Sequence, residues 1–372
     1  MKQDVVVIGA GIIGLATAER LLAHGANVTI LERSHAGQES SWAGGGILSP
    51  LLPWKYSDHV TQLTSHSAKQ FPAWISSLHK VSGIDPEYEI SGMFILPPYD
   101  LEIAKQWCLT RGIEIEQSTS SNISSTENNS DFNRTQPHDR SLFLPNIAQV
   151  RNPRLLRALI NRVMQLGGRI LENCMVHRLN TNHQQIHSIT SSCGEFVADY
   201  YIVSAGAWSV EVLGAHALQL NIRPIKGQML LFKFDTPPMR NILVQNDLYI
   251  IPRRDGHVLI GSTLEDVGFD KQTTISAFNQ LLRHAENILP SLRKIPIKQH
   301  WSGLRPASPR NIPTIGWHPT IRNLLINSGH YRYGVTMAPA SAEILVNEMT
   351  GAKQPFDTSP YQAGWKITDQ PI

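Results

Sequence analysis

A glycine turn near the start of the chain limits the fold more than any other feature of the sequence. Gly9, Gly11 and Gly14 have the spacing G-x-G-x-x-G, follow a strand-length apolar run at 4–8, and open an apolar-periodic stretch that reaches His24. In such a turn the first glycine allows a sharp bend, the second lets a pyrophosphate approach the backbone, and the third lets helix and strand pack closely. The pattern predicts a strand–turn–helix unit that binds a dinucleotide.

An acidic residue supports the same interpretation. Residues 27–32 form a second strand-like run that ends in Glu32, eighteen residues after Gly14. A carboxylate at this place accepts hydrogen bonds from ribose hydroxyls and would repel the 2′-phosphate of NADP. These residues therefore predict a βαβ unit that binds NAD or FAD, and they do not distinguish the two.

Length and composition fit a globular enzyme of two domains. The chain has 372 residues, of which 41% are hydrophobic and 17% charged, and domains usually hold about 100–200 residues. The formal net charge is only +3 and the basic residues are scattered, which argues against a nucleic-acid or membrane partner. No apolar run is long enough for a membrane span, and the first residues do not resemble an export signal, so we expect a cytoplasmic protein.

The three cysteines are far apart in the sequence. Cys108, Cys174 and Cys193 are odd in number and form no C-x-x-C motif. This distribution favours a reducing compartment over a disulfide framework. It gives no support to a metal site.

Periodicity and turn residues outline the rest of the chain. Helices are expected at about 60–81, 152–166, 276–289 and 339–349, and strands at 169–171, 175–179, 186–191, 200–204, 229–234, 249–252, 258–261 and 324–328. Asn152 is expected to cap its helix, with Pro153 in the first turn. The short runs between Arg223 and Trp301 predict an inserted antiparallel sheet, and the Ser-, Thr- and Asn-rich residues 118–136 predict a mobile surface loop.

Several further motifs occur in a fixed order along the chain. They are 39–50 (ESSWAGGGILSP), 204–207 (SAGA), 223–229 (RPIKGQM), 249–254 (YIIPRR), 261–263 (GST), 303–306 (GLRP) and 329–334 (GHYRYG). Together with the first glycine turn, they resemble the D-amino acid oxidase superfamily of FAD-dependent oxidoreductases. The resemblance is closest to the glycine oxidases of thiamine biosynthesis (the ThiO type) and extends over nearly the whole chain.

The resemblance implies an α/β fold, α+β overall, in which an FAD-binding Rossmann-like domain carries an inserted antiparallel-sheet substrate domain. We expect the FAD-binding domain at 1–82, 146–220 and 303–372, and the substrate domain at 83–145 and 221–302. The residues expected to bind FAD are Gly9, Gly11, Ile12, Ile13, Gly14, Glu32, Arg33, Ser40, Ser41, Gly45, Gly46, Ile47, Val176, Ala205, Gly206, His330, Tyr331, Arg332, Tyr333, Gly334, Val335 and Thr336. Related sarcosine oxidases link FAD to a cysteine in the carboxyl-terminal part, whereas the last cysteine here is Cys193, so we expect noncovalent FAD.

The family pattern also implies a substrate site. It assigns a carboxylate-binding arginine to the G-L-R-P motif, Arg305 here, assisted by Tyr249 of Y-I-I-P-R, and Arg332 resembles a further substrate-side residue. A planar guanidinium makes two parallel charge-assisted hydrogen bonds to a carboxylate, so it fixes orientation as well as affinity. His330 is expected to pack beside the flavin rather than act as a base, because hydride transfer from Cα to flavin N5 mainly requires positioning.

The implied reaction is FAD-dependent oxidation of glycine, and of sarcosine and small D-amino acids, to the 2-oxo acid, ammonia and hydrogen peroxide. In the resembling family the imine feeds the thiazole of thiamine and the enzymes are homotetramers, so a small amino acid, O2 and further copies of the chain are the expected partners. Two alternatives stay open: a broader oxidase or dehydrogenase, tuned by residues such as Ile47 and Leu264, and a flavin-binding partner protein without turnover. Asp247 and the 118–136 loop depart from the family pattern.

Overall fold

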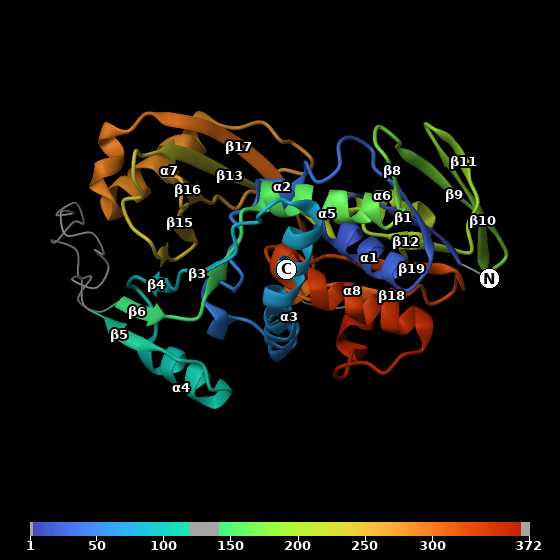
Figure 1. Ribbon diagram of the computed structural model, residues 1–372, viewed down its shortest axis with the longest axis horizontal. Helices are drawn as coiled ribbons and strands as arrows, with labels where there is room; N and C mark the ends of the chain where they lie inside the picture. Colours follow the sequence, from blue (N-terminus) through green and yellow to red (C-terminus); the bar gives the residue numbers. More distant parts are fainter. Residues whose placement is uncertain (1–2, 119–140, 366–372) are drawn as a thin grey trace.

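The computed structural model describes residues 3–118 and 141–365. Two large sheets organise this part of the chain, one near each end of the long axis (Figure 1). From residue 119 onward, the loop expected at 118–136 lies outside the described residues. No helix in the described part is long and apolar enough to cross a membrane.

The first glycine turn belongs to a six-stranded sheet with the strand order β18–β19–β12–β1–β2–β8. The strands are β1 (Asp4–Ile8), β2 (Asn27–Leu31), β8 (Arg169–Leu171), β12 (Tyr200–Val203), β18 (Thr314–Trp317) and β19 (Leu324–Ser328). Neighbouring strands pair in parallel, except β18 with β19. Parallel strands are covered on both faces, which explains why β1 is apolar at four consecutive positions instead of alternating with polar residues.

The two faces of this sheet pack against different layers. Val5 and Val7 of β1 join an apolar cluster with the helices α1 (Ile12–Ala23), α3 (Asp58–Ser82), α5 (Asn152–Gln165) and α8 (Gly334–Thr350). Val6 and Ile8 point the other way, toward the antiparallel sheet of β9 (Val176–Asn182), β10 (Gln185–Ser191) and β11 (Gly194–Phe196). The result is a three-layer domain with the parallel sheet in the middle.

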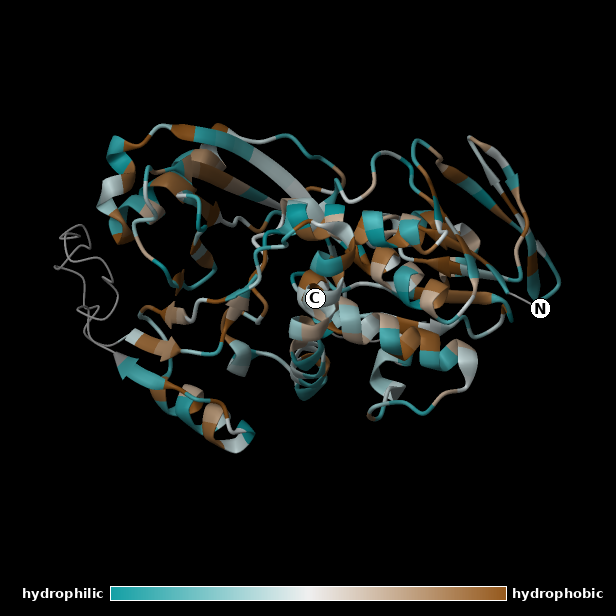
Figure 2. Cartoon of the chain, viewed as in Figure 1, coloured by the Kyte–Doolittle hydropathy of each residue, from teal (hydrophilic) through white to brown (hydrophobic). Residues whose placement is uncertain are grey.

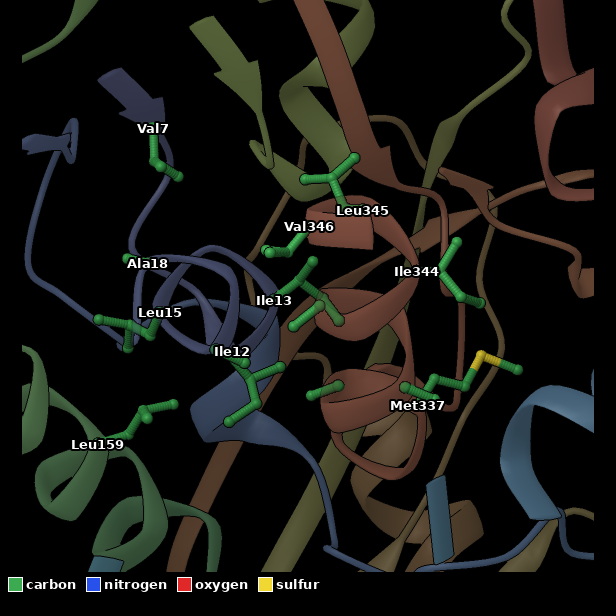
Figure 3. Packing of buried hydrophobic residues seen from close by; sticks show 14 of the residues in the cluster. Val7, Ile12, Ile13, Leu15, Ala18, Leu159, Met337, Ile344, Leu345 and Val346 are labelled. Carbon is green, nitrogen blue, oxygen red and sulfur yellow. The ribbon is translucent and has the colours of Figure 1, made fainter. Parts of the chain in front are cut away.

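Helix α1 is held against this sheet by neighbours that come from distant parts of the chain. Figure 3 shows Ile13 of α1 facing Val346 of α8, while Leu159 of α5 lies beside Ile12 and Leu15. The beginning of α1, where the glycine turn lies, is thereby fixed by packing along the whole helix.

The second large sheet has eight strands in the order β17–β13–β16–β15–β14–β4–β6–β5. Their bounds are β4 (Met93–Ile95), β5 (Glu116–Ser118), β6 (Ser141–Leu144), β13 (Arg223–Lys233), β14 (Ile242–Gln245), β15 (Leu248–Pro252), β16 (His257–Gly261) and β17 (Ile297–Ala307). All neighbours are antiparallel except β14 and β4, which join two separate segments of the chain. Helix α7 (Ile275–Ile288) covers one apolar face, and α4 (Leu101–Arg111) packs against the other. In Figure 2 the edge strands β5 and β17 of this sheet are mainly teal to white.

Short elements connect these layers. They are the helices α2 (Ser40–Ala43), α4 (Leu101–Arg111) and α6 (Ser209–Leu213), the paired strands β3 (Glu89–Ile90) and β7 (Ala148–Gln149), and the 3-10 turns η1 (Pro53–Lys55), η4 (Gly206–Trp208), η5 (Gly214–Ala217), η6 (Pro290–Lys294), η7 (Pro309–Asn311) and η8 (Ser359–Trp365). The expected fold class, a Rossmann-like sheet with an inserted and mainly antiparallel sheet, is confirmed.

Two local predictions were wrong. Helix α8 begins at Gly334 rather than at Pro339, so the proline lies inside the helix; the buried face of α8 stabilises these early turns although proline donates no N–H. Asn152 lies within α5, and the cap position is Arg151. The Asn152 amide is instead used across the fold, as the site shows.

Candidate functional site

A single cavity runs from the carboxyl end of β1 to the eight-stranded sheet. Its lining includes every residue expected from the sequence to bind cofactor or substrate except Gly14. The helical segments 40–43 and 334–336 border it, as do strands β13, β15 and β17. The expected site residues therefore come from eight separate stretches of sequence and meet in one place.

The glycine turn shapes one end of this cavity. Gly9 has φ +104°, and a Cβ there would lie 2.5 Å from the carbonyl oxygen of Ser204. A Cβ on Gly14 would lie 2.0 Å from the Gly9 carbonyl oxygen, so Gly14 serves helix–strand packing and lies behind the cavity wall. A Cβ on Gly11 would meet only Ser41 Oγ within 4 Å and would otherwise project into the cavity.

Helix α1 directs its first backbone N–H groups toward this space. Gly11 is the N-cap residue, and the Ile12 N–H donates to Ser41 Oγ at 2.9 Å. A helix N-terminus without an acidic residue in its first turn favours a phosphate group. The backbone cradle fits the pyrophosphate of a dinucleotide.

Glu32 lies at the end of β2 with its carboxylate buried. Its two oxygens accept hydrogen bonds from the N–H groups of Ala10, at 2.8 Å, and Ser34, at 3.0 Å. Its backbone is held by the end of β8 and the residues that follow it, because its N–H donates to the Leu171 carbonyl and its own carbonyl accepts from the Cys174 N–H. A carboxylate has about four acceptor positions, so ribose hydroxyls can still bind to it.

Two residues that the sequence analysis did not assign to the site hold the second glycine-rich segment. The Asn152 amide donates to the carbonyls of Ser41, at 2.8 Å, and Gly44, at 3.0 Å. Arg253 is fully buried and donates to the Gly45 carbonyl at 2.6 Å. Burial lowers the pKa of Arg253 to about 10, so it remains charged at neutral pH. The adjacent pair Arg253–Arg254 in the 249–254 motif was the available signal, but only the fold shows which arginine points inward.

The other end of the cavity is built from side chains of the eight-stranded sheet. Arg305 of β17 donates to the Thr263 carbonyl at 3.1 Å and to Ser262 Oγ at 2.5 Å. Its guanidinium lies over Gly227 of β13, where a Cβ would come within 2.1 Å of it. Tyr249 of β15 lines the same region with its ring almost fully buried. Burial lowers the pKa of Arg305, while the nearby Tyr249 favours its charged form.

An ionic network around the buried Lys226 connects to Arg305 through Thr263. Lys226 is 1% exposed and lies 3.3 Å from Glu265 and 3.1 Å from Asp270. Glu265 accepts a hydrogen bond from Thr263 Oγ1 at 2.5 Å, and the carbonyl of that threonine accepts from Arg305. Because a buried charge needs its partners, this network restricts the position of the arginine.

A second arginine, Arg332, borders the same end of the cavity. Its Nη1 lies 2.8 Å from Asp247, whereas its buried Nη2 has no hydrogen-bond partner among residues 3–118 and 141–365. The tyrosines Tyr333 and Tyr56 and the Asp247 carboxylate raise the pKa of Arg332 against the effect of burial. One guanidinium donor therefore remains for a ligand.

His330 lies deep in the fold near this arginine. It is 1% exposed, and its Nε2 is 2.9 Å from Ser341 Oγ. Burial lowers the pKa of His330 to about 3, so the imidazole is neutral at physiological pH. Of the two candidates for substrate selectivity, Ile47 lines the cavity, whereas Leu264 is 43% exposed and does not.

The two ends of the cavity define a protein that binds a dinucleotide beside a small carboxylate. A family model for FAD dependent oxidoreductases matches residues 4–348, and the chain belongs to this family. In the described part of the chain, no group of three or more His, Cys, Asp or Glu residues is placed to hold a metal ion.

Similar proteins show which branch of this family the chain resembles most. The glycine oxidase of Pseudomonas aeruginosa is 40% identical over 99% of this chain and 100% of its own length, and that of Pseudomonas putida is 38% identical over 97% and 98%. The bifunctional protein ThiO/ThiG of Trichormus variabilis is 30% identical over 93% of this chain and 52% of its own length. At this identity the chain falls in the glycine oxidase branch of the family.

Solved structures share the fold. The glycine oxidase of Geobacillus kaustophilus superposes with a TM-score of 0.90 at 23% identity, covering 99% of this chain and 100% of that one. The iminodiacetate oxidase of Chelativorans sp. BNC1 gives 0.84 at 23% identity, covering 96% and 98%. Both therefore agree with the two-sheet architecture described above.

Proposed function

We propose that this protein is an FAD-dependent oxidase that converts glycine to glyoxylate, ammonia and hydrogen peroxide. The observation on which this rests is the placement of Arg305 and Tyr249 in the same cavity as the glycine turn and Glu32. A carboxylate-binding fork beside a dinucleotide site fits an amino acid better than an amine or an alcohol. The relatives named glycine oxidase, at 38–40% identity over almost the full chain, support the same activity.

The residues at the substrate end bind and orient. Arg305 receives the substrate carboxylate, Tyr249 adds a hydroxyl donor, and the free Nη2 of Arg332 offers a further one. When bound, FAD supplies the acceptor for the hydride of the substrate Cα. The substrate amine must be neutral for this transfer, and the neutral His330 adds no positive charge near it. The resulting imine hydrolyses to the 2-oxo acid, and O2 leaves as hydrogen peroxide after taking up the two electrons.

We propose that the FAD-binding residues are those expected from the sequence, with Asn152 and Arg253 as supports of the 40–47 segment. Their common cavity favours this assignment. Gly14 contributes through packing.

We further propose that FAD is held without a covalent bond. Among the described cysteines, Cys174 alone lines the cavity, and it does so beside Glu32, where the ribose is expected, rather than near Arg305. Acid denaturation followed by filtration tests this proposal. All yellow colour should pass the filter, and colour retained with the polypeptide would contradict it.

Three further proposals concern organisation. The chain is proposed to divide into the FAD-binding and substrate domains at the boundaries expected from sequence, to form homotetramers and to act in the cytoplasm.

The ThiO/ThiG name of one relative supports delivery of the glycine imine to the thiazole of thiamine. Light scattering after gel filtration tests the tetramer, and growth of a thiamine-requiring deletion strain tests the pathway.

The decisive experiment is a substrate panel with purified protein that shows flavin absorption. Peroxide formation is measured with glycine, sarcosine and D-alanine. We expect kcat/KM to be highest for glycine. A broader oxidase would give similar kcat/KM values for all three, whereas a pocket that excludes one methylene discriminates by about 1–3 kcal/mol, or roughly 10- to 200-fold in kcat/KM. The absence of both peroxide and dye reduction with every substrate would contradict the oxidase proposal.

A further inference from the structure

Two cysteines that are distant in sequence meet beside the cofactor cavity. Cys174 follows β8, and Cys193 lies in the turn between β10 and β11. The pairing of β9 with β10 ends with Val176 opposite Ser191. It continues through the backbone hydrogen bond from Ser192 to Met175, at 2.9 Å. Ser191 also pairs with Gly194 of β11, so Ser192 and Cys193 form the two-residue turn of the β10–β11 hairpin, and this turn lies beside residues 173–175.

The surrounding contacts bring the two thiols together. Cys174 Sγ lies 3.4 Å from Ser191 Oγ, and the same oxygen accepts the Cys193 N–H at 3.1 Å. Cys193 Sγ lies 3.9 Å from the carbonyl oxygen of Asn173, the residue before Cys174. A disulfide requires Cα atoms about 4.4–6.8 Å apart, and the shared contacts with Ser191 and Asn173 bring the two cysteines side by side.

The two thiols differ in access. Cys193 is exposed, whereas Cys174 is 1% exposed and its residue lines the cavity. Burial raises the pKa of the Cys174 thiol, and the neighbouring Cys193 thiol raises it further. An oxidant in solvent therefore meets Cys193 first.

The segment that contains Cys174 also supports the cofactor end of the cavity. Cys174, Met175 and Val176 all line it. The Cys174 N–H donates to the carbonyl of Glu32 at 2.8 Å, and the Asn173 N–H donates to that of Ser34 at 2.9 Å. A covalent bond from this segment to the β10–β11 turn would make local opening of the cavity wall rarer.

We propose that Cys174 and Cys193 form a redox-sensitive pair that closes to a disulfide in hydrogen peroxide and then slows the release of FAD. Peroxide oxidises the Cys193 thiol to a sulfenic acid and is itself reduced to water. The Cys174 thiol displaces hydroxide from that sulfur, which forms the S–S bond and releases a second water. The pair loses two electrons and two protons in total, and a dithiol restores both thiols. The inference rests on the proposed function only for the source of peroxide inside the cell.

The test uses holoenzyme treated with reagent peroxide, so it does not depend on glycine turnover. Thiol titration of the unfolded protein should fall from three thiols to one, and non-reducing peptide maps should contain the 174–193 link, which dithiothreitol should remove. The FAD release rate, followed by the rise in flavin fluorescence, should fall at least threefold on oxidation. Cys193→Ser should lose both responses, and the matched variant Cys108→Ala should keep them.

Three results would overturn the proposal. The first is oxidation of Cys193 to sulfinic acid while Cys174 still titrates as a thiol. The second is a Cys193–Cys193 link between two chains in place of the internal bond. The third is an equal FAD release rate in the linked and reduced forms, which would refute the effect on the cofactor. A failure of glycine oxidation in the substrate panel would leave all three readouts measurable, so the two proposals fail separately.

Discussion

The cofactor end and the substrate end of the cavity are built in different ways. At the cofactor end, backbone N–H groups, glycines and the carboxylate of Glu32 form the surface. Gly9, Gly11 and Glu32 belong to the first βαβ unit, and Gly44, Gly45 and Gly46 follow it in the chain. At the substrate end, Arg305 and Arg332 point in from separate segments and are held by partners from others. The cofactor end keeps its shape because glycines leave the backbone uncovered. The substrate end keeps its shape only while the hydrogen-bond and ion-pair partners of its arginines hold them in position.

Removal of the Arg305 guanidinium should have the largest effect on activity. Arg305→Ala should lower kcat/KM for glycine by about 100- to 1,000-fold, because losing one side of a buried charge-assisted pair costs about 3–4 kcal/mol. FAD absorption should be retained, as Arg305 lies at the other end of the cavity from Glu32. Peroxide assays and flavin spectra measure the two effects, with exposed Arg254→Ala as the control. Equal losses in the two variants would refute the assignment.

Two glycines that face each other in β13 and β17 separate the two ends directly. Gly227 pairs with Gly303, and a Cβ would lie 2.1 Å from the Arg305 guanidinium at the first but 2.5 Å from Ala43 of α2 at the second. Gly227→Ala should lower kcat/KM by about 10- to 100-fold with FAD affinity unchanged. The added Cβ would displace the Arg305 guanidinium, and a misplaced substrate-binding group lowers the rate by about this factor. Gly303→Ala should instead weaken FAD binding. The reverse pattern, measured by flavin titration and steady-state kinetics, would contradict the placement of Arg305.

The charge of Glu32 tests the cofactor end. Glu32→Gln should weaken FAD binding by about 10- to 100-fold, because hydrogen bonds to a charged acceptor contribute about 1.5–3 kcal/mol. The KM for glycine at saturating FAD should stay within about twofold. Fluorescence titration of the apoprotein with FAD measures the affinity, and Glu102→Gln on the surface of α4 is the control.

The ion pair of Asp247 with Arg332 can be used to test whether Arg332 faces the substrate. Asp247→Asn should raise kcat/KM for an amino acid with a second carboxylate, such as iminodiacetate, by about 3- to 5-fold, since an exposed acid contributes up to about 1 kcal/mol. Activity with glycine should change less. Asp266→Asn, which breaks an exposed pair with Arg223, should alter neither. A preference for the dicarboxylate that stays constant would show that Arg332 does not face the substrate.

His330 should make the free energy of unfolding depend on pH. Its pKa in the fold is about 3 against 6.5 ordinarily, so the unfolded chain binds a proton that the folded chain does not as the pH falls below 6.5. The contribution is complete above pH 6.5 and is lost at roughly 1.4 kcal/mol per pH unit between 6.5 and 3. Denaturant melts from pH 7 to pH 5 should give a shallower slope for His330→Gln than for the parent protein, whereas exposed His79→Gln should leave the slope unchanged.

The local parts of the fold could be predicted because their signals lie within a few residues. Strand β1 at 4–8 and strand β19 at 324–328 were predicted with their observed bounds, and α1 was predicted to within about a residue of its end. Apolar runs, periodicity and glycine spacing determine such elements with little help from the rest of the chain. The start of α8 could not be found in this way, because the packing of its buried face outweighs the effect of Pro339.

The site residues also fall into two groups: those that local sequence patterns predict and those that only the tertiary structure shows. The glycine turn and Glu32 could be assigned to a dinucleotide from their spacing alone, because each acts through local backbone geometry. The use of Asn152 as a support of residues 41–44, the choice of Arg253 over Arg254, and the meeting of Cys174 with Cys193 all depend on contacts between distant segments. Such contacts carry no local pattern, since a side chain finds its partner only after the sheets have packed and fixed its direction.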